Sequence, residues 1–138
     1  MKKAIGIYLG ESKSAIAFKD TYVKIIRNKE NEEFTPNYVS LRKDELIVGR
    51  TAYALKNTDP INTVHSIRKL IGLSIKDKTV QDIIESPYYE FEIAALKGGT
   101  EDAVAVILGG KQYTPEQLSA EILKKLKRDA EEKLGDEV

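Results

Sequence analysis

Residues 4–18, AIGIYLGESKSAIAF, combine two strand-like runs with a tight turn at Gly10. Successive backbone N–H groups in such a turn can form a concave anion site, so this arrangement is typical of phosphate binding. A magnesium–phosphate site would also want a carboxylate before the turn and a hydroxyl after the glycine, because magnesium prefers oxygen ligands. The chain has Tyr8 and Glu11 at those places. Taken alone, the segment is more often a plain β-hairpin.

The elements that must position this turn are strands first and helices later. Runs of β-forming residues predict an antiparallel meander of three strands and then a strand pair, at 4–9, 14–19, 22–26, 37–41 and 45–49. Helical spacing then predicts helices at 51–57, 61–72 and 80–86. Two further strands are predicted at 88–96 and 102–108, followed by a two-residue hairpin turn at Gly109 and Gly110.

The clearest predicted element is a long helix near the end of the chain. Thr114, Pro115 and Gln117 give a hydroxyl N-cap, a proline at the first helical position and a capping-box partner. Apolar residues follow at spacings of three and four, and Gly135 supplies the C-terminal stop. We expect an amphipathic helix of roughly 20 residues with one apolar face.

Composition limits the class of protein. With 41% hydrophobic and 32% charged residues, the 138-residue chain is long and apolar enough for a globular core. Its net charge of zero gives no reason to expect nucleic acid as a partner. The absence of cysteine excludes disulfides, thiolate metal sites and a cysteine nucleophile. No run resembles a signal peptide or a membrane span, so we expect a cytoplasmic protein without membrane partners.

Four blocks of sequence occur here in one order: IGIYLG, FTPNYVSL, IVGRTAYALKNTDPINTVHSIRKLIG and GKQYTPEQLSAEILKKLKRDAEEKLGDEV. Together they closely resemble the opening of the seventy-kilodalton heat-shock chaperones, the DnaK-type ATPases. The resemblance implies a mixed α/β fold of the actin-like, ribonuclease-H-like group, whose two lobes hold nucleotide between them. Residues 1–36 would be the opening strands of the lower part of lobe I. Residues 37–112 would be its upper subdomain, and 113–138 the helix returning toward the lower part.

In that family the first strand ends in D-L-G-T-T, where the carboxylate holds water on magnesium and the turn binds phosphate. By resemblance, Gly10 matches the turn glycine, Ser12 keeps a hydroxyl and Lys13 takes the next, variable place. Tyr8 replaces the aspartate, and a phenol with a pKa near 10 stays neutral at pH 7. Glu11 replaces the first threonine and would repel a phosphate at roughly 4 Å by about 1–4 kcal/mol. We expect an altered phosphate site with no metal ligand.

The resemblance also marks a catalytic position in the predicted helix at 61–72. A family lysine that positions the attacking water corresponds to Arg68, whose guanidinium keeps the charge but changes the donor geometry. Lys69 would point about 100° away on an α-helix, which makes it a poor substitute. The lone histidine, His65, is interpreted as structural.

The resemblance therefore predicts a fragment cut from the nucleotide-binding domain of a chaperone-like protein involved in protein folding. ATP or ADP with magnesium would be the cofactor of the full-length family, with weak or no binding and no ATP hydrolysis by this chain alone. The expected partners are the remainder of the chaperone chain, co-chaperones or nucleotide-exchange factors, and other copies through uncovered apolar surface. Two alternatives stay open: a full-length parent that is still an active ATPase, and a stand-alone interaction module.

Overall fold

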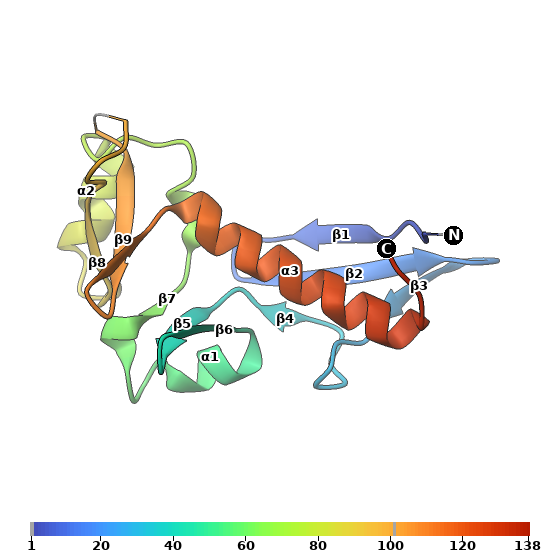
Figure 1. Ribbon diagram of the computed structural model, residues 1–138. Coiled ribbons are helices and arrows are strands. Elements are labelled where there is room, and N and C mark those ends of the chain that lie inside the picture. The colour runs from blue at the N-terminus through green and yellow to red at the C-terminus, as the bar shows by residue number, and fades with distance from the viewer. Residues whose placement is uncertain (1, 101) are drawn as a thin grey trace.

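A computed structural model describes residues 2–100 and 102–138 of the chain. Met1 and Glu101, which fall within the segments expected at 1–36 and 37–112, lie outside the described residues. Helices and antiparallel strands are mixed along the chain, so the predicted mixed α/β class is confirmed. Figure 1 shows three groups of strands joined by one long helix.

The first sheet carries the turn at Gly10. Its strands are β1 (Gly6–Leu9), β2 (Lys13–Lys19), β3 (Val23–Ile26) and β4 (Thr35–Pro36). The central strand, β2, pairs antiparallel with each of the other three, which confirms the predicted meander. The turn therefore lies at one end of a rigid hairpin.

The two faces of this sheet have different surroundings. Ile16 pairs with Ile26, and both side chains are buried on the face toward the core. On the opposite face the side chains of Tyr8, Val23 and Ile25 are 57%, 66% and 51% exposed. We call these three residues the open sheet face.

The second group of strands follows. It contains β5 (Val39–Arg42), β6 (Glu45–Val48), helix α1 (Arg50–Leu55), the 3₁₀ turn η1 (Pro60–Asn62), β7 (Thr63–Val64) and the 3₁₀ turn η2 (Ile67–Lys69). The two predicted strands and the short helix after them are confirmed.

The helix predicted at 61–72 is wrong. Val64 pairs with Val39 across the sheet and is fully buried, so this part of the segment is extended. Ser66 then adopts the left-handed conformation with φ 57°, which separates β7 from η2. Ile67 and Leu70 are both buried and lie three residues apart, as the 3₁₀ period requires. Sheet pairing and two short turns can produce apolar spacing that resembles an α-helix.

The third group is a helix followed by a small sheet. Its elements are α2 (Lys78–Glu85), β8 (Glu92–Ala95), β9 (Val104–Leu108) and β10 (Lys111–Tyr113). Gly109 and Gly110 have φ of 57° and 76° and join β9 to β10, so the predicted two-residue hairpin is confirmed. Both positions need positive φ, which glycine adopts without steric cost.

The long helix α3 (Pro115–Leu134) joins the third group to the first sheet (Figure 1). The predicted capping box is present, with Thr114 and Gln117 bonding reciprocally, and Gly135 ends the helix with φ 66°. Just beyond, the Lys3 N–H donates to the Glu137 carbonyl at 2.8 Å, so the two ends of the chain meet. No helix in the described part of the chain has the length and apolar character needed to cross a membrane.

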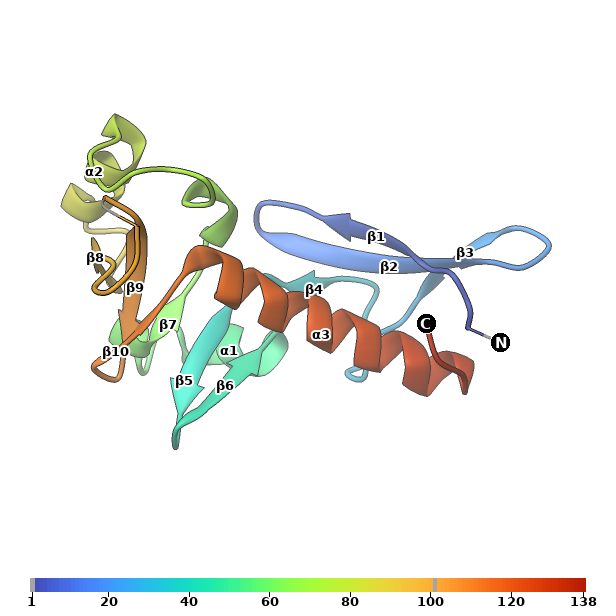
Figure 2. The same cartoon turned by 45° about the horizontal axis from the view of Figure 1, so that its top comes forward.

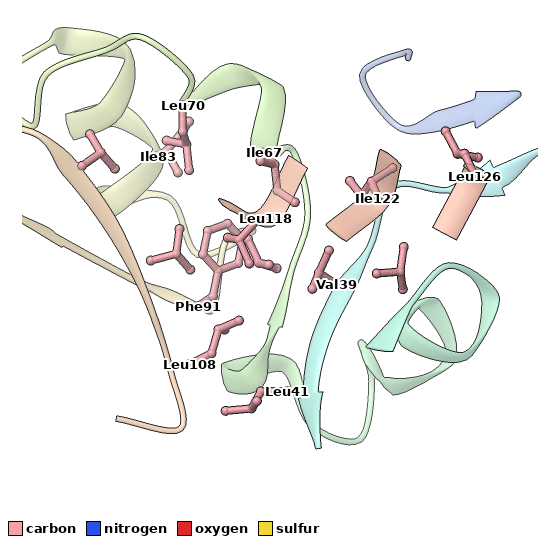
Figure 3. Packing of buried hydrophobic residues seen from close by; sticks show 14 of the residues in the cluster. Val39, Leu41, Ile67, Leu70, Ile83, Phe91, Leu108, Leu118, Ile122 and Leu126 are labelled. Atoms are coloured by element: carbon pink, nitrogen blue, oxygen red, sulfur yellow. The ribbon is translucent and has the colours of Figure 1, made fainter. Parts of the chain in front are cut away.

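The core lies where α3 crosses the strands. Leu118 and Ile122 lie beside Ile67 and Val39, and Leu126 lies further along the helix in the same cluster (Figure 3). All five side chains are at most 3% exposed. Burial of this helix face fixes the second and third groups against the first sheet and holds η2 near the turn at Gly10.

Candidate functional site: the turn between β1 and β2

The turn at Gly10 is held by backbone and side-chain hydrogen bonds. The Gly10 N–H donates to the Lys13 carbonyl at 3.0 Å. Asn37 donates from its side chain to the Gly10 carbonyl at 2.7 Å and from its backbone to the Ser12 carbonyl at 2.9 Å. The Ser14 hydroxyl completes the set by donating to the Asn37 side chain at 2.6 Å. Asn37 is 4% exposed, and these bonds fix the shape of the turn.

Sequence reasoning missed Asn37. The only available signal was a polar residue directly after Pro36 at the start of an apolar strand. Such a residue usually satisfies buried backbone groups, but the sequence does not say which ones.

Glycine is required at position 10 because of its neighbours. A Cβ there would lie 2.6 Å from the Lys13 carbonyl oxygen and 2.7 Å from the Tyr8 hydroxyl. The phenol of Tyr8 therefore leans over the turn, although most of its side chain faces solvent. The space beside Gly10 is occupied by this ring and not by a carboxylate.

Glu11 extends from the turn toward η2. Its carboxylate lies 3.1 Å from the ammonium of Lys69, which also donates to the Tyr89 hydroxyl at 3.4 Å. The hydrogen bonds to Glu11 and then Tyr89 raise the pKa of Lys69, so the ammonium is protonated at neutral pH. The predicted α-helix pointed Lys69 about 100° away from Arg68, but in the structure its ammonium contacts the turn directly.

The geometry of η2 explains this contact. Because Ile67 and Leu70 both point into the core, Arg68 and Lys69 between them are left on the surface. Arg68 borders a small hollow together with Gly10 and Glu11. Both cations therefore lie beside the turn, Arg68 at this hollow and Lys69 at the Glu11 carboxylate.

The remaining predicted residues lie around the same turn. Ser12 borders two neighbouring cavities of about 440 Å³ and 220 Å³. The ammonium of Lys13 lies 4.0 Å from the centre of the Phe34 ring, a cation–π contact that directs it away from Lys69. The structure therefore brings Glu11 and Arg68 together and places Lys13 in a different contact.

An aromatic cluster lies on the other side of Lys69. We define it as Tyr38, His65, Tyr88, Tyr89 and Phe91. The His65 ring stacks between Tyr38 at 5.1 Å and Tyr89 at 5.3 Å, with interplanar angles of 28° and 24°. Tyr88 and Phe91 meet its edge at 5.1 Å and 5.4 Å. His65 lies between β7 and η2 and packs as one ring of this cluster.

The donor set of the turn is unlike a magnesium–phosphate site. Tyr8 supplies a phenol hydroxyl in place of a carboxylate, and the one carboxylate of the turn, Glu11, is paired with Lys69. Among residues 2–100 and 102–138, no three His, Asp or Glu side chains are grouped so that they could hold a metal ion. The arrangement can form hydrogen bonds and ion pairs, but the anion that its cation Lys69 binds is the Glu11 carboxylate of the same chain.

Comparison with known proteins identifies the family. A family model described as "Hsp70 protein" matches residues 4–138. The chain is also 44% identical over 140 aligned positions to "Chaperone protein DnaK" of Psychrobacter cryohalolentis. That alignment covers 100% of this chain and 21% of the relative, so the chain spans about a fifth of the length of the protein it matches. The chain belongs to the Hsp70 family.

Proposed function

We propose that the chain is the opening part of the nucleotide-binding domain of an Hsp70-type chaperone that acts in protein folding. Its phosphate turn is altered, so that this chain alone neither binds ATP tightly nor hydrolyses it. In this proposal residues 1–36 begin the lower part of lobe I, residues 37–112 form its upper subdomain, and 113–138 return toward the lower part. The observation that carries the proposal is the pair of side chains at the turn, Tyr8 and Glu11.

The chemistry of those two side chains supports the altered-site proposal. ATP with magnesium would need a carboxylate beside the turn to hold water on the metal, and the phenol of Tyr8 does not replace it. An anionic phosphate would also approach the Glu11 carboxylate, and like charges at that range repel. The residues present therefore do not fit a magnesium–phosphate group.

The open sheet face supports a proposal about partners. Tyr8, Val23 and Ile25 expose apolar surface on one side of the first sheet, and such surface marks an interaction site. The remainder of a chaperone chain is the proposed partner, with a second copy of the chain as the alternative. Co-chaperones, exchange factors and a cytoplasmic location are proposed from family membership alone.

Calorimetry with ATP and ADP in the presence of magnesium tests the proposed function. The unmodified chain is expected to give no binding heat. A variant with Tyr8→Asp and Glu11→Thr restores the carboxylate and removes the repulsion, so it is expected to bind measurably. Tyr22→Asp is the matched control, because Tyr22 is also exposed but lies at the other end of β2.

Tight binding by the unmodified chain would contradict the proposal and favour the alternative, an active ATPase. In that case Ser12 and Arg68 are the residues to replace first, because both border the turn. Equal gains in the double variant and the Tyr22→Asp control would show that the gain in binding does not depend on the restored site.

A further inference from the structure

Three separated segments meet at Lys69. Its ammonium contacts Glu11 on the β1–β2 turn and Tyr89 on the segment before β8, and Lys69 itself ends η2. In Figure 2 the β1–β2 turn and the segment of η2 approach each other above α3. The contact therefore joins the first sheet to parts of the chain that are 58 and 78 residues further along (69 − 11 and 89 − 11).

A cavity of about 220 Å³ extends from this contact along the aromatic cluster. Among the residues that line it, Glu11 is the one carboxylate and Lys69 the one ammonium or guanidinium. His65 also faces the cavity, and burial together with the nearby charges of Lys56 and Lys69 lowers its pKa, so the ring is neutral at pH 7. An anion entering the cavity would find a single cation, and Glu11 already pairs with it.

The supports of the contact are fixed, but the ion pair between them is exposed to solvent. Tyr89 is fixed by stacking on His65 at 5.3 Å, and the turn is fixed by the buried side chain of Asn37. Glu11 and Lys69 are 57% and 42% exposed, so their pairing is screened by solvent and reversible. A reversible pair between two rigid supports can be opened by a competing anion without disturbing the fold.

We propose that Glu11 is a built-in anion that occupies the cation beside the phosphate turn, Lys69, and that through Lys69 and Tyr89 it links the turn to the aromatic cluster in the absence of nucleotide. The inference rests on the proposed function, since it treats the turn as a changed phosphate site. It assigns to Lys69, and not to Arg68, the cation that receives the anion. It also gives Glu11 an attractive role in addition to repulsion of phosphate.

Inorganic triphosphate without magnesium is the appropriate probe, because it needs neither a base pocket nor a metal. Its binding to the complete chain can be followed by NMR, which reports both the dissociation constant and the signals that move. Four variants are compared with the unmodified chain: Glu11→Gln, Lys69→Gln, both together, and Glu33→Gln. Glu33 is the matched control, because its exposed carboxylate lies 3.8 Å from Arg27 and lines the cavity of about 440 Å³ beside Ser12, so its replacement removes a carboxylate near the turn without changing the pair of Glu11 and Lys69.

Glu11→Gln removes the competing charge with little change of shape and should tighten triphosphate binding about tenfold. The signals of the turn and of Lys69 should move together. In the double variant the gain should disappear, because the receiving cation is gone. Glu33→Gln should behave like the unmodified chain. Dispersed amide signals in every variant establish that each one is folded.

Two results would overturn the inference. If Glu11→Gln binds triphosphate no more tightly than Glu33→Gln, Glu11 does not occupy an anion site. If the double variant keeps the gain, Lys69 is not the receiving cation and simple repulsion explains Glu11. Both results are distinguishable from a failure of the proposed function, which fails when the unmodified chain binds magnesium ATP tightly.

Discussion

Two neighbouring residues, Gly10 and Tyr8, define what the turn between β1 and β2 can accept. Glycine is needed at position 10 because a Cβ would meet both a carbonyl oxygen and the Tyr8 ring. The same ring fills space that a smaller carboxylate would leave open to a hydrated metal ion. The turn thus keeps the glycine expected of the proposed phosphate turn, while the side chains around it have a different chemistry.

His65 allows a prediction at the scale of one residue. Burial within the aromatic cluster, and then the charges of Lys56 and Lys69, lower its pKa below the ordinary value of 6.5 in the folded chain. In the unfolded chain the ring takes up a proton more readily. The free energy of unfolding should therefore be fully retained above about pH 6.5 and should fall as the pH drops through the lowered folded-state pKa.

Urea unfolding between about pH 5 and 8 measures this dependence. His65→Gln removes the titrating ring, so its free energy of unfolding should change less over the same range. Carboxylates titrate similarly in both proteins and cancel in the comparison. Parallel curves for the two proteins would show that the protonation of His65 is not linked to folding.

At the scale of elements, local signals were sufficient where they were strong and failed where sheet pairing competed. Helix α3 was predictable because Thr114, Gln117 and Gly135 mark both of its ends and its apolar stripe is regular. The segment 61–72 has a similar apolar pattern, but Val64 pairs with Val39 and so lies in a strand. No local sequence signal predicts this pairing between distant residues. The sequence also did not reveal the contact of Lys69 with Glu11 on the turn, which joins residues 58 positions apart.

Helix α3 provides a matched pair of leucines for a prediction about packing. Leu126 is fully buried, whereas Leu123 on the same helix is 39% exposed. Leu126→Ala should lower the free energy of unfolding by about 2–5 kcal/mol, because it leaves a cavity between the helix and the strands. Leu123→Ala should lower it by less than about 1 kcal/mol. Both changes have the same effect on helix propensity, so the difference reports packing.

Chemical denaturation of the two variants gives the free energies directly. Equal losses for Leu126→Ala and Leu123→Ala would mean that the buried face of α3 does not hold the sheets together. An unchanged denaturant dependence of the free energy, the m-value, would support an unaltered unfolded state in both variants.

At the scale of the whole molecule, α3 also ties distant segments through a buried cation. Lys125 is 7% exposed and lies 3.1 Å from Glu30 in the β3–β4 connection and 2.9 Å from Asp129 on its own helix. Gly49 passes directly beneath, since a Cβ there would lie 2.8 Å from the Lys125 side chain. The sequence predicted α3 as a helix. It did not predict the surface that α3 packs against, because contacts such as that of Lys125 with Glu30 join residues 95 positions apart.

The open sheet face leads to a prediction about the molecule as a unit. One face of the first sheet is covered by the core, while Tyr8, Val23 and Ile25 leave the other apolar and accessible. Burial of such a face against another copy gains roughly 25 cal/mol per Å² of apolar area. The chain alone should therefore self-associate, and its weight-average mass in sedimentation should rise with concentration.

Charges placed on the open sheet face should prevent this association. Val23→Lys combined with Ile25→Lys puts two cations on the surface that the copies would share, and burying them unpaired is unfavourable. Ile61→Lys is the matched control, because Ile61 is 63% exposed but lies in η1 and not on the sheet. A loss of association in the sheet variant alone identifies the face. A chain that sediments as a single copy at every attainable concentration would show that three exposed apolar side chains are too small an area to hold a partner, and that any partner in a longer protein must add contacts of its own.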